Sequence, residues 1–131
     1  QECFVCHQNG ATVICSETGC QRSFHLPCAV TGKCVTQYIW QRRAFCSEHS
    51  PRQTVEAVPK KGTLCLICLE AVDDKQSFGT MVCPTCQHAW LHRHCVQGQA
   101  VSAGSSCFQC PLCRDRRAFQ REMLLMGIWV P

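Results

Sequence analysis

Cysteines and histidines recur along this chain of 131 residues at spacings that suit metal binding. Fifteen residues are cysteine and six are histidine. Two residues between a pair of ligands let one tight turn direct both side chains at a single ion, and four ligands complete a tetrahedral zinc site. One such pair is a weak signal, because redox and haem motifs share it. Repeated pairs at ordered spacing predict four zinc sites.

The sixteen predicted ligands form two sets of eight. The second half of the chain has the order Cys-x2-Cys, x14, Cys-x2-Cys, x5, His-x2-Cys, x14, Cys-x2-Cys, and the first half has a related order that closes on Cys-x2-His. The ligands are Cys3, Cys6, Cys15, Cys20, His25, Cys28, Cys46 and His49, then Cys65, Cys68, Cys83, Cys86, His92, Cys95, Cys110 and Cys113. We favour His92 over His94, because only His92 has the two-residue spacing to Cys95. Spacing alone leaves open whether the pairs within each half combine in sequence or interleave.

The pairing of cysteines with histidines distinguishes zinc from disulfide bonds. Disulfide-rich domains are secreted and have mostly isolated cysteines, whereas zinc ligands occur as pairs with histidines among them in a reducing compartment. We therefore predict zinc and an intracellular location, without a membrane, since no run of 18 apolar residues occurs. Cys34 and Cys107 remain outside the ligand sets and are predicted to be buried structural thiols rather than nucleophiles.

The formal charge of +4 is not an argument for nucleic acid binding. Zinc-bound cysteines are thiolates, so the four sites together contribute about −5 and the loaded chain carries about −1. Local basic groups such as Arg42 and Arg43, or Arg114, Arg116 and Arg117, leave direct contact with DNA open.

The elements that position the ligands are predicted to be short. Each half is near the size below which a domain needs metals to fold, so the fold class is a small zinc-stabilised α+β protein of two tandem modules. We expect the first module at 1–50, a linker at 51–63 rich in proline and lysine, the second module at 64–118 and a helical tail at 119–131 packed on it. Short strands are expected at 11–14, 38–40, 80–82 and 89–91, and helices at 27–30, 96–103 and from about residue 120.

The first module resembles the PHD finger of the extended PHD domains, and the phrase GCQRSFHLPCAV carries most of that resemblance. The zinc knuckle that precedes such fingers is absent. The resemblance implies a cross-brace in which ligands interleave. Cys3, Cys6, His25 and Cys28 would share one zinc, and Cys15, Cys20, Cys46 and His49 another. By the same scheme Cys65, Cys68, His92 and Cys95 form the third site, and Cys83, Cys86, Cys110 and Cys113 the fourth.

The second module has PHD-like spacing, but three features resemble a RING domain. Ile67 lies in a Cys-x-Ile-Cys turn, Pro111 lies in Cys-Pro-x-Cys, and Arg114 follows the last ligand. With the first module, the linker and a tail reading EMLLMGI, the chain resembles the PHD finger protein seven family of histone ubiquitin ligases, relatives of the G2/M-phase ligase. Members of that family continue into a further PHD finger, so we expect this chain to be an excised ligase core.

That resemblance implies a RING-type E3 ubiquitin ligase. Ile67, Pro111 and Leu112, with Val96 or Val101 nearby, would form a groove for a ubiquitin-conjugating enzyme (E2), and Arg114 would be the linchpin that bridges E2 to its bound ubiquitin. The thioester is already activated, so the ligase acts by orientation. The implied substrate is histone H3 in the nucleosome, in the nucleus.

A non-enzymatic tandem reader of histone tails is the alternative. It would add a tail strand to the edge at 11–14 or 80–82, with Asp73 and Asp74 facing an unmodified lysine or arginine. A reader has no need of Arg114 together with Ile67 and Pro111.

Overall fold

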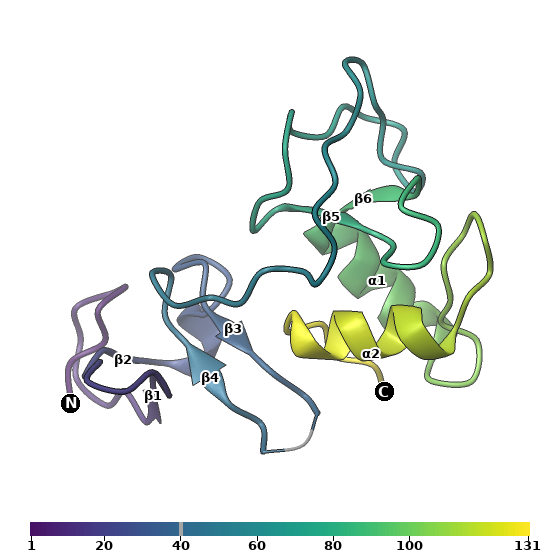
Figure 1. The fold of residues 1–131 in the computed structure, drawn as a ribbon. Helices are drawn as coiled ribbons and strands as arrows, with labels where there is room; N and C mark the ends of the chain where they lie inside the picture. The colour runs from purple at the N-terminus through teal and green to yellow at the C-terminus, as the bar shows by residue number, and fades with distance from the viewer. Residues whose placement is uncertain (40) are drawn as a thin grey trace. The chain divides into compact units, whose positions relative to one another are not determined.

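A computed structural model of the protein describes residues 1–39 and 41–131, and the chain divides into two compact units. The first comprises Gln1–Arg52 with Leu125–Gly127, and the second Gln53–Leu124 with Ile128–Pro131. Both consist of short strands, turns and helices, so the prediction of a small zinc-binding α+β protein of tandem modules is confirmed (Figure 1). None of the described helices has the length and apolar character needed to cross a bilayer.

Two antiparallel strand pairs organise the first unit. Strand β1 (Val13–Ile14) pairs with β2 (Ser23–Phe24), and β3 (Val35–Thr36) pairs with β4 (Ala44–Phe45). A 3-10 helix, η1 (Leu26–Cys28), follows β2 where a short helix was expected. The strand expected at 38–40 was wrong for Tyr38 and Ile39, which lie in the connection between β3 and β4, while Trp40 falls outside the described residues.

Small side chains dominate the core of the first unit. Phe24 is fully buried beside Cys3, Ala11 and Ala29, and the edge of Phe4 meets its ring at a centroid separation of 6.2 Å. Such a core removes little apolar surface from water, so the metal centres must contribute much of the folding free energy.

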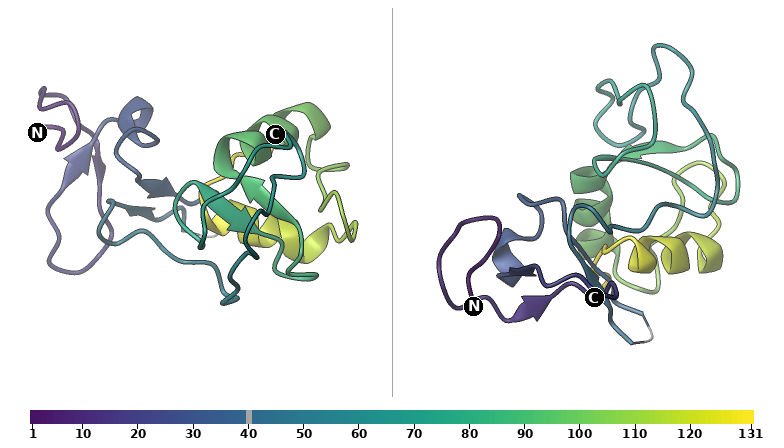
Figure 2. Two further views of the ribbon diagram at one scale, coloured as in Figure 1. Left: turned by 90° about the horizontal axis from the view of Figure 1, so that it is seen from above. Right: turned by 60° about the vertical axis from the view of Figure 1, so that its left-hand side comes forward.

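A hairpin followed at once by a helix forms the centre of the second unit. Strand β5 (Thr80–Val82) pairs antiparallel with β6 (Trp90–His92), with Met81 opposite Leu91. The chain then enters α1 (Arg93–Ala103) without a loop, as the views in Figures 1 and 2 show. Both strands and this helix were expected within a few residues of their observed bounds, and Gly104, with φ +71°, ends the helix.

The tail forms helix α2 (Arg117–Leu125), which begins three residues before the expected position. The carboxylate of Asp115 accepts a hydrogen bond of 2.8 Å from the Phe119 N–H and so caps the first turn. Phe119 and Met123 are buried, and Phe119 meets Phe108 edge to face at 5.1 Å. The helix therefore contributes large apolar side chains to the core of the second unit.

The predicted linker 51–63 differs from the structure, because its central residues belong to the second unit. The side chain of Gln53 is buried and makes two hydrogen bonds with Val82, donating to the carbonyl at 2.6 Å and accepting from the N–H at 2.8 Å. Gln76 donates to the carbonyls of Val55 and Ala57 at 2.9 and 3.0 Å. A segment whose backbone and side chains are bonded in this way is part of the fold, although its proline and lysine content is typical of a linker.

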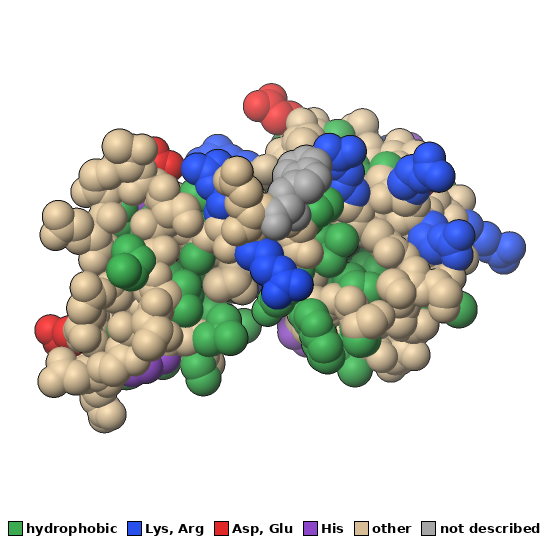
Figure 3. Space-filling model, turned by 90° about the horizontal axis from the view of Figure 1, so that it is seen from below, with side chains coloured by type: hydrophobic (Ala, Val, Ile, Leu, Met, Phe, Trp, Pro, Cys, Tyr) green, Lys and Arg blue, Asp and Glu red, His purple; other side chains and the backbone are tan. Residues whose placement is uncertain are grey.

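Hydrophobic side chains also reach the surface, in several places on the face drawn in Figure 3. In the first unit Leu26 is 55% exposed and Val30 72% exposed. In the second unit the exposed side chains include those beside the zinc-type turns.

Candidate metal centres and the surface beside them

The structure brings the sixteen predicted ligands together in four tetrads, and in each half of the chain the pairs interleave. Within a tetrad, all ligand atoms lie within 4.8 Å of one another. The tetrads are Cys3, Cys6, His25 and Cys28; Cys15, Cys20, Cys46 and His49; Cys65, Cys68, His92 and Cys95; and Cys83, Cys86, Cys110 and Cys113. Interleaving resolves the alternative that spacing left open, since a sequential arrangement would have joined neighbouring pairs.

The separations between sulfur atoms fit a tetrahedral zinc ion. Zinc–sulfur bonds of about 2.3 Å place two thiolates of one tetrahedron about 3.8 Å apart. The Sγ atoms of Cys83 and Cys113 are 3.8 Å apart, and those of Cys86 and Cys110 are 4.0 Å apart. A disulfide requires about 2.05 Å. Three tetrads combine three cysteines with one histidine and the fourth is all cysteine, so the donor sets fit four zinc ions.

The histidine ligands present Nδ1 to their tetrads. His92 Nδ1 lies 3.2 Å from Cys68 Sγ, while its Nε2 lies 2.9 Å from the carbonyl of Ala71. His25 has the same arrangement, with Nε2 3.1 Å from the carbonyl of Asn9. A carbonyl can only accept, so each Nε2 carries the proton and each Nδ1 keeps its lone pair for the metal. Because these partners of Nε2 are backbone carbonyls, the sequence alone does not reveal them.

Each Cys-x2-Cys turn closes in the same way. The residue after the second cysteine has a positive φ, and its N–H bonds to the carbonyl of the first cysteine. This holds for His7 at 2.8 Å, Leu69 at 2.9 Å, Gln87 at 3.0 Å and Arg114 at 3.0 Å. None of the four is glycine, so the turn holds each in a conformation that L residues seldom adopt. The carbonyl is thereby satisfied, and both sulfur atoms point to the same side.

In the first and third tetrads, backbone N–H groups favour the thiolate form of the first cysteine. Burial raises the pKa of the Cys3 thiol, but hydrogen bonds from the backbone at Cys6, His25 and Val5 outweigh it and lower the pKa to about 6. In Cys65 the same opposition lowers the pKa to about 7.

The last cysteine of these tetrads shows the opposite shift. Burial raises the pKa of Cys28 to about 11, and the neighbouring thiolates of Cys3 and Cys6 add to the rise. Burial and the thiolates of Cys65 and Cys68 raise the pKa of Cys95 to about 12. Three thiolates therefore repel one another at each site, and a divalent cation removes that repulsion.

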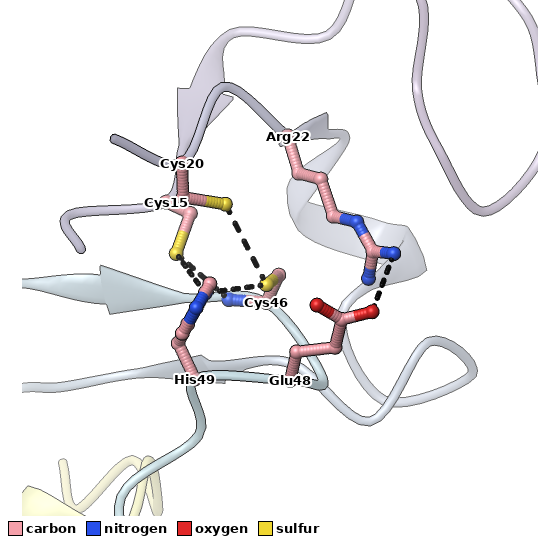
Figure 4. A network of polar contacts seen from close by, with 6 residues as sticks. All are labelled: Cys15, Cys20, Arg22, Cys46, Glu48 and His49. Carbon is pink, nitrogen blue, oxygen red and sulfur yellow. Dashed lines mark hydrogen bonds and ion pairs between the residues drawn. The ribbon is translucent and has the colours of Figure 1, made fainter. Parts of the chain in front are cut away.

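A basic residue lies beside the second tetrad (Figure 4). Arg22 Nη2 is 2.8 Å from Glu48 Oε1, and the guanidinium lies 5.0 Å from the centre of the Phe4 ring. Glu48 stands between Cys46 and His49 in the sequence, so this ion pair connects the last zinc turn to the segment after Cys20. The pair is largely exposed and is worth less than about 1 kcal/mol.

The predicted E2-contact residues lie on the surface of the second unit. Ile67 is 36% exposed and Leu112 52% exposed, and Pro111 and Arg114 are exposed as well. Each of these residues is next to a tetrad ligand in the sequence, so the metal sites fix the position of its backbone. The prediction that Val96 lies beside the groove is wrong, because its side chain is buried in the core and only 1% exposed. Val101 on the same helix is 52% exposed.

The two remaining cysteines differ in environment. Cys34 is buried, and burial together with nearby thiolates raises its pKa to about 11. Cys107 is exposed, so the prediction of a buried thiol is wrong there, and its Sγ lies 3.8 Å from Ser106 Oγ. No histidine bonds to either thiol in the described residues, so neither has the activated setting of a catalytic cysteine.

The β5 edge that the reader alternative requires is occupied. The side-chain amide of Gln53 is hydrogen-bonded to both the N–H and the carbonyl of Val82, and all three residues of β5 are buried. Ser77 donates to the Asp73 carboxylate at 2.9 Å. In the first unit, β1 has β2 as its strand partner, and Ile14 is 50% exposed. Of the two edges that this alternative names, β1 is the one with no such side-chain partner among the described residues.

Comparison with known proteins gives a match to a family model over part of the chain. Residues 1–50 match the model described as a PHD-like zinc-binding domain. This segment contains the first two tetrads and agrees with the prediction of a PHD-type finger there.

Relatives extend the similarity to the second unit. The chain is 39% identical to the human G2/M phase-specific E3 ubiquitin-protein ligase over 131 residues, which are 99% of this chain and 19% of the relative. It is 38% identical to the Gallus gallus protein of that name over 130 residues, 98% of this chain and 18% of the relative. It is 29% identical to histone-lysine N-methyltransferase 2D of Mus musculus over 115 residues, 87% of this chain and 2% of the relative. The chain thus spans about a fifth of the length of the ligases it matches.

Proposed function

We propose that this chain is the core of an E3 ubiquitin ligase of RING type, from the PHD finger protein seven family. The observation that carries the proposal is the surface of the second unit, where exposed Ile67, Pro111 and Leu112 stand on zinc turns and exposed Arg114 follows the last ligand. The names of the relatives with 38–39% identity support it, since those proteins are E3 ubiquitin ligases.

The partners follow from this surface. Ile67, Pro111 and Leu112 would receive an apolar loop of an E2 enzyme, because small exposed apolar groups on rigid turns suit a shallow interface. Arg114 would donate several hydrogen bonds in a fixed fork to E2 and to the ubiquitin it carries. The zinc ions hold these turns in place and supply no step of the transfer.

The reaction would proceed by restriction of motion. The E2 thioester is already reactive, and the ligase holds ubiquitin in the orientation that lets a lysine amine attack the thioester carbonyl. The amine forms the new amide bond, and the E2 thiolate leaves. Neither Cys34 nor Cys107 takes part.

The substrate would be chromatin, with histone H3 in the nucleosome as the first candidate and the nucleus as the location. Similarity to a histone-lysine methyltransferase and the PHD-like first unit favour a chromatin substrate. In the first unit β1 offers an edge to which a histone tail strand could add, so this unit would supply substrate contact.

A reconstituted reaction tests the proposal. The chain is incubated with E1, ubiquitin, ATP and a panel of E2 enzymes, with nucleosomes as substrate and Ile67→Ala as the matched variant. We expect ubiquitin on H3 with the parent chain and a large loss with the variant. If no E2 yields any conjugate, on histones or on the chain itself, the ligase proposal fails, and binding of H3 peptides to the β1 edge becomes the better explanation.

A further inference from the structure

Arg114 is followed by a capped helix, whereas the other three Cys-x2-Cys turns of the described chain continue into extended or irregular segments. We infer that Asp115 is a positioning residue for Arg114, holding the linchpin through the start of α2. The inference rests on the proposed ligase function. Asp115 is neither a ligand in the four tetrads nor one of the predicted E2-contact residues.

Asp115 makes one hydrogen bond to a residue before Arg114 in the sequence and one to a residue after it. Its backbone carbonyl accepts a hydrogen bond of 2.9 Å from the N–H of Cys110, the first ligand of the turn. Its carboxylate Oδ2 accepts one of 2.8 Å from the N–H of Phe119, within the first turn of α2. Asp115 thus connects the fourth metal site to the helix, with Arg114 between Cys113 and this connection.

The backbone of Arg114 is held in an unusual conformation, which Asp115 extends to the start of α2. Its φ of +64° is in the left-handed region, which a residue with a side chain keeps only when its surroundings impose it. The hydrogen bond from the Arg114 N–H to the Cys110 carbonyl, at 3.0 Å, holds the incoming side. On the outgoing side, the bond from the Cys110 N–H to the Asp115 carbonyl holds the backbone, and the Asp115 carboxylate adds the connection to α2.

The helix that Asp115 caps is itself fixed at this end. Arg116 Nη1 donates to the Ser106 carbonyl at 2.5 Å. Gln120 Nε2 donates to the carbonyls of Ser105 and Phe108 at 2.8 and 2.7 Å. The first turn of α2 is therefore held in place, and Asp115 connects Arg114 to this turn.

The consequence is specific to the linchpin step. A fork of donors acts only when it stands within a narrow range of positions relative to E2 and ubiquitin. Loss of the cap removes the side-chain connection to α2 and leaves the backbone bond to Cys110, so Arg114 has more freedom and occupies the productive position less often. The apolar contact surface at Ile67 and Leu112 is unaffected. The maximal transfer rate should fall while affinity for E2 alone is retained.

The test uses the whole chain and measures discharge of ubiquitin from a purified E2 conjugate onto free lysine at saturating ligase. The variants are Asp115→Ala, which removes the cap, and Asp115→Asn, whose side-chain oxygen can still accept the Phe119 N–H bond. Thr54→Val is the stability control, because it removes a hydroxyl bonded to Glu122 near the middle of α2 and leaves Asp115 unchanged. Affinity for E2 alone is measured by NMR titration.

We expect Asp115→Ala to lower the maximal rate about fivefold, the size of a lost helix cap, and Asp115→Asn and Thr54→Val to remain close to the parent. E2 affinity should be equal in all four proteins. Equal rates for Asp115→Ala and an active parent would overturn this inference alone. It also fails if Asp115→Asn is as slow as Asp115→Ala, since charge and not the cap would then matter. An inactive parent would overturn the proposed function as well.

Discussion

The buried amide of Gln53 donates a hydrogen bond of 3.2 Å to the carboxylate of Glu122, which joins the segment between the two sets of ligands to helix α2. Thr54 adds two donors, its N–H at 3.0 Å and its hydroxyl at 3.1 Å. A buried carboxylate is tolerated only when its lone pairs are satisfied, and these three groups do so. The start and the end of the second unit are thereby held together.

Replacement of Gln53 tests the strength of this connection. Gln53→Ala leaves Val82 without its two partners and Glu122 without one, so the free energy of unfolding should fall by about 2–3 kcal/mol. Urea titration at a fixed excess of zinc measures it. Gln76→Ala is the matched control, because Gln76 is only half-buried and bonds to two carbonyls of the same segment. Equal midpoints for Gln53→Ala and the parent would contradict the assignment of this segment to the fold.

The four tetrads predict four zinc ions per chain. Cys6→Ser should bind three, because the first tetrad loses a thiolate, whereas Cys107→Ser should retain four, since Cys107 belongs to no tetrad. Metal analysis of the purified proteins gives the count. Removal of all zinc should unfold both units, because each structural site contributes on the order of 10 kcal/mol. Circular dichroism that does not change after complete chelation would show that the core suffices without metal.

The two spare thiols should differ in reactivity. Thiolate is the reactive form, and with a pKa of about 11 the buried Cys34 carries almost none of it at neutral pH. Raising the pH to about 8 leaves it protonated, since the folded pKa still lies well above. Iodoacetamide on the zinc-loaded chain should therefore modify Cys107, located by mass spectrometry, and spare Cys34 until the metal is chelated. Modification of Cys34 at the same rate would show that the first unit opens readily.

The apolar contact with E2 should depend on Ile67 and not on its neighbour Leu69. Ile67→Ala removes an apolar anchor and should weaken E2 binding roughly tenfold, while the unit stays folded. Leu69 is 69% exposed in the same turn and lies outside the predicted groove, so Leu69→Ala is the matched control. NMR titration with E2 measures both. If the two variants bind alike, the contact lies elsewhere on the second unit.

The ligand pattern allowed the main features of the fold to be predicted, because the spacing of Cys65 and Cys68 or of His92 and Cys95 forces tight turns whatever lies between them. The β5–β6 hairpin and α1 were predicted from apolar runs on either side of ligands. The anchoring of Gln53 was missed, because its partners are backbone atoms of Val82 and the distant Glu122. No repeat in the sequence indicates either contact. The early start of α2 depended on Asp115, whose position after Arg114 resembled an ordinary loop.

Arg114 tests the ligase proposal most directly. Discharge of ubiquitin from a purified E2 conjugate onto free lysine is measured with the parent chain, with Arg114→Ala and with Arg117→Ala, an exposed arginine three residues further on. We predict that the parent accelerates discharge, that Arg117→Ala remains close to it, and that Arg114→Ala loses the acceleration. Absence of acceleration across a panel of E2 enzymes, or an Arg114→Ala variant as active as the parent, would contradict the proposed function.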